Sequence, residues 1–281
     1  MTLKMTTSKR LVRGAGNMAL ALMLLWTAIP FYWMIATSLK HDKEIYGYEA
    51  TLIPQQPTVA NYITIIKDTP YLLYLRNSTV VALSSTLLSI IIASLGAYAI
   101  ARLNFPGRAL LARGLVCTYL VPPSLLFIPL FAIMSALRLT DTLSGLTLAY
   151  LGGDVPFCTW LLMGYFKSVP VELEEAALVD GCNRVTALIR VVLPVCLPAL
   201  VVVTFFSFTR AWNEFLYAYV FTSTNQARTI TAGLVNFMSA DVFFWGPLMA
   251  STVMSALPPV IMFLVFQRWV VKGLTLGAVK G

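Results

Sequence analysis

Glu175-Ala176-Ala177-Leu178-Val179-Asp180-Gly181, followed by nine residues and then by Val191-Val192-Leu193-Pro194, is the stretch that decides the fold. It lies in a polar segment, residues ~167–195, that interrupts a strongly apolar chain. The charged residues of its first half, Glu175 and Asp180, are not expected inside a membrane-spanning helix, because charges are costly there. The stretch therefore predicts an insert that projects from the apolar part of the chain.

Local signals in the insert predict two short helices. Pro170 suits the first turn of a helix, where its missing N–H costs nothing. Gly181 can adopt the left-handed conformation that ends a helix, and Asn183 can cap the next one. Pro194 and Pro198 then mark the bend back into apolar sequence. We expect a rigid lever, with Ala176 and Ala177 on its surface so that a neighbouring backbone can approach closely.

The composition predicts an all-α, polytopic membrane protein. Hydrophobic residues make up 58% of the 281 residues and charged residues only 11%, about half the share of a soluble domain. The apolar runs are long enough to cross ~30 Å of hydrocarbon as helices. Six transmembrane helices are expected in a single domain covering residues 1–281, near residues 17–39, 78–101, 114–136, 143–166, 196–222 and 246–267.

The distribution of basic residues predicts the orientation. With the N-terminus inside, the cytoplasmic segments hold 13 Lys and Arg residues and the outer segments 6. Cytoplasmic segments carry the excess in membrane proteins. Both termini, the insert and a tail over residues 268–281 are therefore expected in the cytoplasm. The long outer loop, residues 40–77, is expected to fold as a cap.

The quoted stretch resembles the E-A-A-x(3)-G-x(9)-I-x-L-P motif of ABC-transporter permeases, with Val191 in place of isoleucine. Three further features are similar to the carbohydrate-importer branch, and to the second permease of the maltose transporter in particular. They are Pro170-Val171-Glu172-Leu173-Glu174-Glu175-Ala176-Ala177, Trp212-Asn213-Glu214-Phe215, and the chain end Gly273-Leu274-Thr275-Leu276-Gly277-Ala278-Val279-Lys280-Gly281. Leu276 is bulkier than the branch pattern.

The resemblance implies an insert that docks, as a coupling helix, on a separate ATPase. The implied coupling residues are Glu174, Glu175, Ala176, Ala177, Asp180, Gly181, Leu193 and Pro194. The tail would reach between the ATPase subunits through Lys272, Gly273, Leu274, Thr275, Gly277 and Lys280. From the residues alone, an amphipathic connector on the membrane surface and a frayed terminus are the alternatives.

The implied assembly has a homologous partner permease, two ATPase subunits and an extracytoplasmic solute-binding protein, in a bacterial or archaeal cytoplasmic membrane. The chain would need no cofactor, because ATP and Mg would bind to the ATPase subunits. It has no G-x-x-x-x-G-K-[ST] sequence and one histidine, His41, without a metal-ligand set. We therefore assign no catalytic and no metal site, and expect neither an enzyme nor a nucleic-acid binder.

Polar residues within the spans are candidates for a translocation pathway. Arg210 and Glu214 share a helical face by their i,i+4 spacing, and Asn213, Trp212 and Tyr217 lie nearby. Asp154 follows Gly152-Gly153 and precedes Pro156, which predicts a broken helix in the fourth span. Hydrogen-bonding groups and aromatic rings suit a sugar. A structural ion pair and a packing kink are equally good interpretations.

The function predicted is a permease subunit of a binding-protein-dependent ABC importer for carbohydrate. Arg210 leaves open a phosphorylated polyol such as glycerol phosphate as the substrate of the same transporter type. An ion-coupled secondary transporter is a further alternative, but the second half of the chain does not mirror the first.

Overall fold

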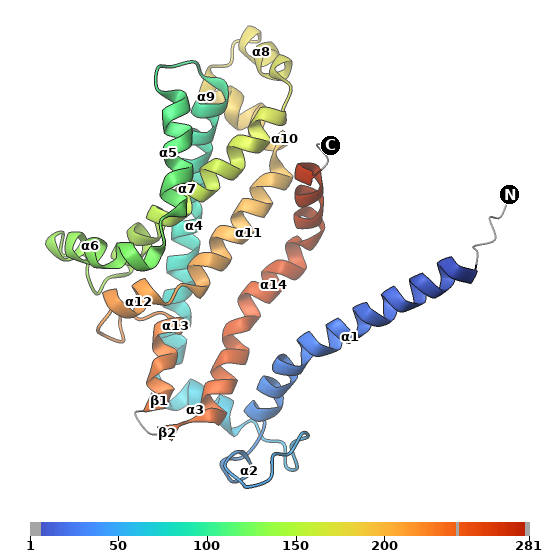
Figure 1. Cartoon of the computed structure of the whole chain (residues 1–281). Coiled ribbons are helices and arrows are strands. Elements are labelled where there is room, and N and C mark those ends of the chain that lie inside the picture. Colours follow the sequence, from blue (N-terminus) through green and yellow to red (C-terminus); the bar gives the residue numbers. More distant parts are fainter. Residues whose placement is uncertain (1–6, 240–241, 279–281) are drawn as a thin grey trace. The chain divides into compact units, whose positions relative to one another are not determined.

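A computed structural model describes residues 7–239 and 242–278 (Figure 1). Within these ranges the regular secondary structure is helical apart from a short hairpin, in which β1 (Met238–Ser239) pairs antiparallel with β2 (Val242–Phe243). The prediction of an all-α protein is confirmed. The chain divides into two compact units. The first holds the residues up to Thr69 together with Asn236–Met254, and the second holds Pro70–Val235 together with the residues from Ser255 onward.

The first unit contains α1 (Thr7–Ser38), α2 (Asp42–Ile45), α3 (Ala60–Asp68) and the beginning of α14 (Trp245–Ala278). The side chain of Asn61 ties the end of α1 to α3, because its amide donates to the carbonyl oxygens of Ser38 at 3.0 Å and Lys40 at 2.9 Å. The segment over residues 40–77, which was expected to fold as a cap, thus contains α2 and α3, although its last residues already belong to α4.

The second unit contains the remaining helices, which Figure 1 shows in order along the chain. They are α4 (Tyr71–Arg102), α5 (Arg108–Leu120), α6 (Pro123–Ala136), α7 (Leu143–Ser168), α8 (Val171–Val179), α9 (Arg184–Ala187), the π-helical turn η1 (Leu188–Val192), α10 (Leu193–Val195), α11 (Leu197–Asn213), α12 (Leu216–Phe221) and α13 (Ile230–Gly233). The 3-10 turn η2 (Leu234–Phe237) follows α13.

Helix α4 is the centre of the second unit, where it packs against α7 and α11. Its buried face is rich in small side chains, which let helices approach closely in a membrane: Ser78, Ala82, Ser85, Ser89, Ala93 and Ala97. Polar contacts supplement this packing, since the hydroxyls of Ser84 on α4 and Thr147 on α7 lie 3.0 Å apart.

The insert shares a hydrophobic core with the long helices. Leu188 and Val192 of η1 are fully buried against α4, α7 and α11. The other buried members of this core are Ala93, Ala97, Tyr98, Cys158, Leu162, Phe166, Val169, Cys196, Ala199 and Val203. The insert therefore does not hang from a flexible linker, because its second half is part of the packed body.

Within the part of the chain that the structure describes, four helices are long and apolar enough to cross a membrane, and the count rises to six if each of two bent helix pairs forms one span. In the first pair, α5 and α6 meet at 99° around Pro122 and Pro123. In the second pair, the segment Arg184–Val195 meets α11 at 86°.

Two expectations about the spans are wrong. The fifth was expected to be continuous to residue 222, but α11 ends at Asn213 because the backbone of Glu214 is extended. The fourth was expected to be broken, but α7 continues through Gly152, Gly153 and Pro156. Neighbouring helices hold α7 in place, and the carbonyl oxygen of Gly153 accepts a hydrogen bond from Arg210.

Candidate functional site

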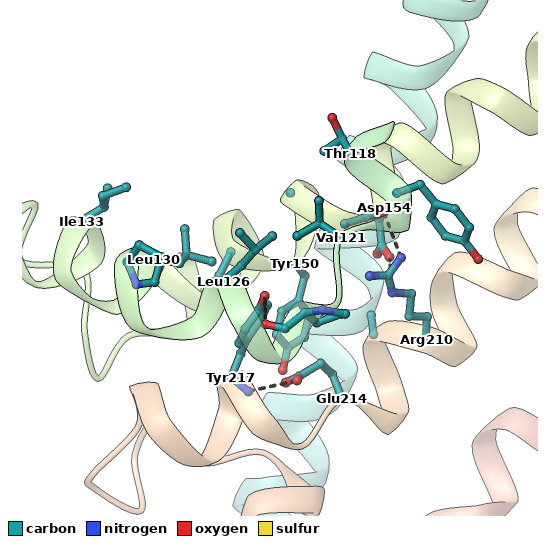
Figure 2. A pocket seen from close by; sticks show the side chains of 17 residues that line it. Thr118, Val121, Leu126, Leu130, Ile133, Tyr150, Asp154, Arg210, Glu214 and Tyr217 are labelled. Carbon is teal, nitrogen blue, oxygen red and sulfur yellow. Dashed lines mark hydrogen bonds and ion pairs between the residues drawn. The ribbon is translucent and has the colours of Figure 1, made fainter. Parts of the chain in front are cut away.

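A cavity of about 550 Å³ lies in the second unit between α5, α6, α7, α11 and α12. Figure 2 shows that α6 contributes an apolar wall, whereas α7 and α11 contribute the charged groups. Its polar lining residues are Thr118, Tyr119, Tyr150, Asp154, Arg210, Glu214 and Tyr217. Four of the six residues predicted for a translocation pathway are therefore brought together here: Asp154, Arg210, Glu214 and Tyr217.

Asp154 and Arg210 form an ion pair, which we call the cavity pair. The Arg210 Nε lies 3.3 Å from the Asp154 Oδ1, and Figure 2 shows the two side chains pointing toward one another. The carboxylate is buried, with 2% of its side-chain surface exposed, whereas the arginine side chain keeps 38%. Ser207 donates to the Asp154 Oδ2 at 3.3 Å. The arginine thus compensates a buried charge and still faces the cavity.

Glu214 was expected to share a helical face with Arg210, but the structure gives it a different role. Because α11 ends before it, Glu214 does not sit on a helical face beside Arg210, and it caps the next helix instead. Its carboxylate accepts hydrogen bonds from the backbone N–H groups of Tyr217 at 2.9 Å and Ala218 at 3.0 Å. A carboxylate is favoured at the positive end of a helix. Figure 2 shows the Tyr150 hydroxyl directed toward this carboxylate.

The other two predicted pathway residues do not line the cavity. Trp212 is buried, its ring stacks on Phe208 with centroids 5.5 Å apart, and its Nε1–H donates to the Ser255 carbonyl oxygen at 3.0 Å. Asn213 is exposed and donates to the Thr209 carbonyl oxygen at 2.8 Å.

The cavity can bind a solute by hydrogen bonds at one end and by apolar contact along its wall. Tyr150, Tyr119 and the α6 residues Leu126, Leu130 and Ile133 were not predicted to take part. The adjacent prolines Pro122 and Pro123 could have indicated the α6 residues. The chain bends by 99° at this point, and α6 then forms the apolar wall of the cavity.

The insert forms as the sequence predicts in its local structure. Helix α8 begins at Val171, so Pro170, expected in the first turn, is instead the cap residue just before it, and Glu172 and Glu174 occupy the first turn. Gly181 has φ +89°, the left-handed conformation. The Asn183 side chain accepts a hydrogen bond from the Thr186 N–H at 2.8 Å and so caps α9.

Half of the predicted coupling residues are exposed along α8 and the turn after it: Glu175, Ala176, Asp180 and Gly181. Ala177 is buried, so the expectation that both alanines lie on the surface is wrong for this one. Leu193 is half-buried against the hydrophobic core, and Pro194 is exposed.

Glu174 is also buried, with 3% of its surface exposed. It lies among three polar side chains that we call, together with it, the insert cluster: Tyr98, Arg102 and Arg184. The Tyr98 hydroxyl donates to its carboxylate, the Arg102 Nε lies 3.5 Å from its Oε2, and the Arg184 Nη1 lies 3.3 Å from its Oε1. The sequence pairs Tyr98 with Arg102 at an i,i+4 spacing, but only the fold shows what they contact.

The tail residues are in part helical. Helix α14 continues through Pro258 and Pro259 to Ala278, so Lys272, Gly273, Leu274, Thr275 and Gly277 have helical backbone. Lys280 lies outside the described residues. Within the ranges that the structure covers, no three His, Cys, Asp or Glu side chains are grouped as metal ligands.

Comparison with known proteins places the chain in a family. Residues 85–276 match the family described as "Binding-protein-dependent transport system inner membrane component". The sulfoquinovosyl glycerol transport system permease protein SmoH of Agrobacterium fabrum is 40% identical over 94% of this chain and 92% of its own. The trehalose/maltose transport system permease protein MalG of Thermococcus litoralis is 35% identical over 97% of this chain and 98% of its own.

A solved structure has the same fold. A chain of a bacterial ABC transporter involved in the import of the acidic polysaccharide alginate superposes with a TM-score of 0.83, covering 95% of this chain and 99% of its own, at 22% identity. The fold, the length of the match and the identity to curated permeases agree. The chain belongs to the family of binding-protein-dependent transport system inner membrane components.

Proposed function

We propose that this chain forms half of the membrane pathway of an ABC importer for carbohydrate and that its insert couples this pathway to a separate ATPase. The observation that carries the proposal is the helix α8, which presents Glu175 and Ala176 on its exposed surface and is followed by the exposed Asp180 and the left-handed Gly181. The second half of the insert is packed into the core of the long helices, so a push on α8 would reach them.

The assembly in this proposal has four kinds of component. Besides this chain, a homologous partner permease completes the pathway, two ATPase subunits bind on the cytoplasmic side, and an extracytoplasmic binding protein delivers the solute. The excess of basic residues supports an orientation with both termini and the insert in the cytoplasm. The insert and the end of α14 would then lie on the side where ATP is found.

Carbohydrate is the substrate class that the cavity supports best. Hydroxyl groups can bond to Asp154, Arg210, Glu214 and Tyr150, and the sugar face can lie against apolar and aromatic side chains. The relatives named for sulfoquinovosyl glycerol and for trehalose/maltose transport point in the same direction. A phosphorylated polyol is less favoured, because Asp154 already neutralises Arg210 and Glu214 adds a second carboxylate to the lining.

Co-purification in detergent tests the coupling role. The ATPase should come out with the wild-type chain, and Glu175→Lys or Gly181→Pro should release it. Glu49→Lys, an equally exposed charge reversal on the outer loop, and Gly107→Pro, at the other left-handed glycine (φ +86°), serve as matched controls that should retain it. Full ATPase retention and transport by both insert variants would refute the coupling role.

Uptake by Arg210→Leu tests the substrate class. If the cavity pair serves a neutral sugar, uptake of neutral and anionic solutes should fall together. A much greater loss for an anionic solute would instead show that Arg210 binds an anionic group, and would favour the phosphorylated polyol.

A further inference from the structure

The insert cluster joins three helices through one buried carboxylate. Glu174 comes from α8, Tyr98 and Arg102 come from the last turns of α4, and Arg184 comes from α9. Arg102 makes a further contact, because its Nη2 donates to the carbonyl oxygen of Val169, the residue that follows α7, at 2.5 Å. A single side chain of the insert is thereby tied to the ends of both α4 and α7.

The connection is closed to solvent on the side of α4. The Glu174 carboxylate has 4% and the Arg102 side chain 7% of its surface exposed, whereas Arg184 is 56% exposed. The Tyr98 hydroxyl makes a charge-assisted hydrogen bond to the carboxylate, which is stronger than a neutral one, whereas Arg102 contacts it as an ion pair without a hydrogen bond. Burial protects both contacts from screening by salt. A buried carboxylate is costly unless its partners stay in place. The cluster therefore holds α8 at a fixed position on α4.

Helix α4 leads from this cluster to the walls of the cavity. It packs along α7 and α11, which carry Asp154 and Arg210. Small side chains fill its buried face, so a displacement of α4 is passed directly to its neighbours. The other side of α8, which carries Glu175 and Ala176, is exposed and is not part of this packing.

We infer that Glu174 is a positioning residue that transmits movement of α8 to α4 through Arg102 and Tyr98, so that ATP binding can change the cavity. This rests on the proposed docking of α8 on an ATPase. Glu174 itself contacts no ATPase in this scheme, because it faces inward. The residue next to it, Glu175, belongs to the docking surface.

The test separates ATP hydrolysis from the response of the cavity and needs no knowledge of the transported solute. A cysteine-free transporter, purified with its ATPase and carrying Leu126→Cys in the cavity wall, is labelled with a maleimide. The labelling rate is compared without nucleotide and with MgATP plus vanadate. The parent complex should show a nucleotide-dependent change in rate.

Glu174→Gln keeps the shape of the side chain and removes its charge. We expect the complex to stay assembled and to hydrolyse ATP, while the nucleotide-dependent change in labelling falls about tenfold, the effect of losing one charged hydrogen bond from a coupling equilibrium. Glu172→Gln, an exposed neighbour in the first turn of α8, is the matched control and should respond like the parent.

Tyr98→Phe is the second variant, and it tests the inference on its own if the Glu174→Gln protein does not fold. It removes one hydroxyl from the cluster and should weaken the response in the same direction, by severalfold. A parent-like response in an assembled Glu174→Gln complex, or in Tyr98→Phe, would overturn the inference. An absent response in the parent complex itself would instead count against the proposed docking, which distinguishes the two failures.

Discussion

The insert cluster and the cavity pair use the same chemistry in different surroundings. In the insert cluster, Glu174 contacts two arginines and a tyrosine, and the guanidinium on α4 is almost completely buried. In the cavity pair, Asp154 contacts one arginine, whose side chain is 38% exposed to the cavity. The first arrangement suits a permanent connection between helices. The second keeps a charged group within reach of a solute.

Arg102→Leu should cause the largest loss of stability. It leaves the buried Glu174 with Tyr98 and the exposed Arg184, and breaking a buried ion pair by removing one partner costs roughly 3 kcal/mol. Thermal unfolding in detergent measures the loss. Arg108→Leu, an exposed arginine six residues further on, should change stability by less than about 0.5 kcal/mol. Equal effects of the two substitutions would show that the cluster does not hold the insert.

Asp154→Asn should cost less, about 1.5 kcal/mol. The asparagine can still accept a hydrogen bond from Ser207, and the freed Arg210 can turn toward water in the cavity. The same unfolding measurement serves for both substitutions. A loss as large as that of Arg102→Leu would mean that the cavity pair is as closed as the insert cluster, and the contrast drawn above would fail.

Gly153→Ala probes the cavity pair without removing either charge. A methyl group at this position would overlap the Arg210 guanidinium, so we expect the arginine to move, with the loss of its bond to the Gly153 carbonyl oxygen and about 1 kcal/mol of stability. Gly152→Ala is the matched control, because nothing lies within 4 Å of its added methyl group. It should be neutral or stabilising, since alanine favours a helix. Thermal unfolding of both variants in detergent measures the difference in stability, and equal losses would contradict the predicted overlap with Arg210.

Substitution of Asp141 should have the smallest effect on stability. Its carboxylate has no arginine partner among the contacts given below, so it serves as a reference for the two ion-paired carboxylates. Its carboxylate accepts hydrogen bonds from the N–H groups of Ser223 at 2.9 Å and Thr224 at 3.0 Å, and from the Thr224 hydroxyl at 2.8 Å. Partial burial raises the pKa of Asp141, but these hydrogen bonds outweigh it, so the pKa lies below its ordinary value.

A lowered pKa in the folded state means that the stabilisation is present above the unfolded-state pKa, about 4, and is lost as the pH falls through the folded-state pKa. The stability difference between the wild type and Asp141→Asn should therefore be at most about 0.5 kcal/mol at neutral pH, because the group is screened by solvent. It should shrink on acidification below pH ~4. A difference that grows in acid would contradict this account.

Much of the fold could be predicted from the sequence, because apolar length, proline and glycine act locally. The long helices, the turn at Gly181 and the cap at Asn183 follow from such signals. The continuity of α7 and the end of α11 could not be predicted. Both depend on contacts with other helices, such as the Arg210 bond to the Gly153 carbonyl oxygen and the Glu214 cap on α12.

The candidate site was predicted in composition but not in geometry. Charged residues within apolar runs identified Asp154 and Arg210, since such residues are rare there without a purpose. Their pairing with one another was not visible, because 55 positions separate them along the chain. The same limit applies to Glu174, whose burial depends on side chains from α4 far earlier in the sequence.

The π-helical turn η1 lets the insert hold one residue more than an α-helix would need at the same place. A π-helical turn holds an additional residue relative to the α-helix. Deleting Ile189 should therefore let the segment close as an ordinary helix, while Leu188 and α8 keep nearly the same directions relative to α11. Inserts that differ by one residue at this turn can thus present α8 in the same way.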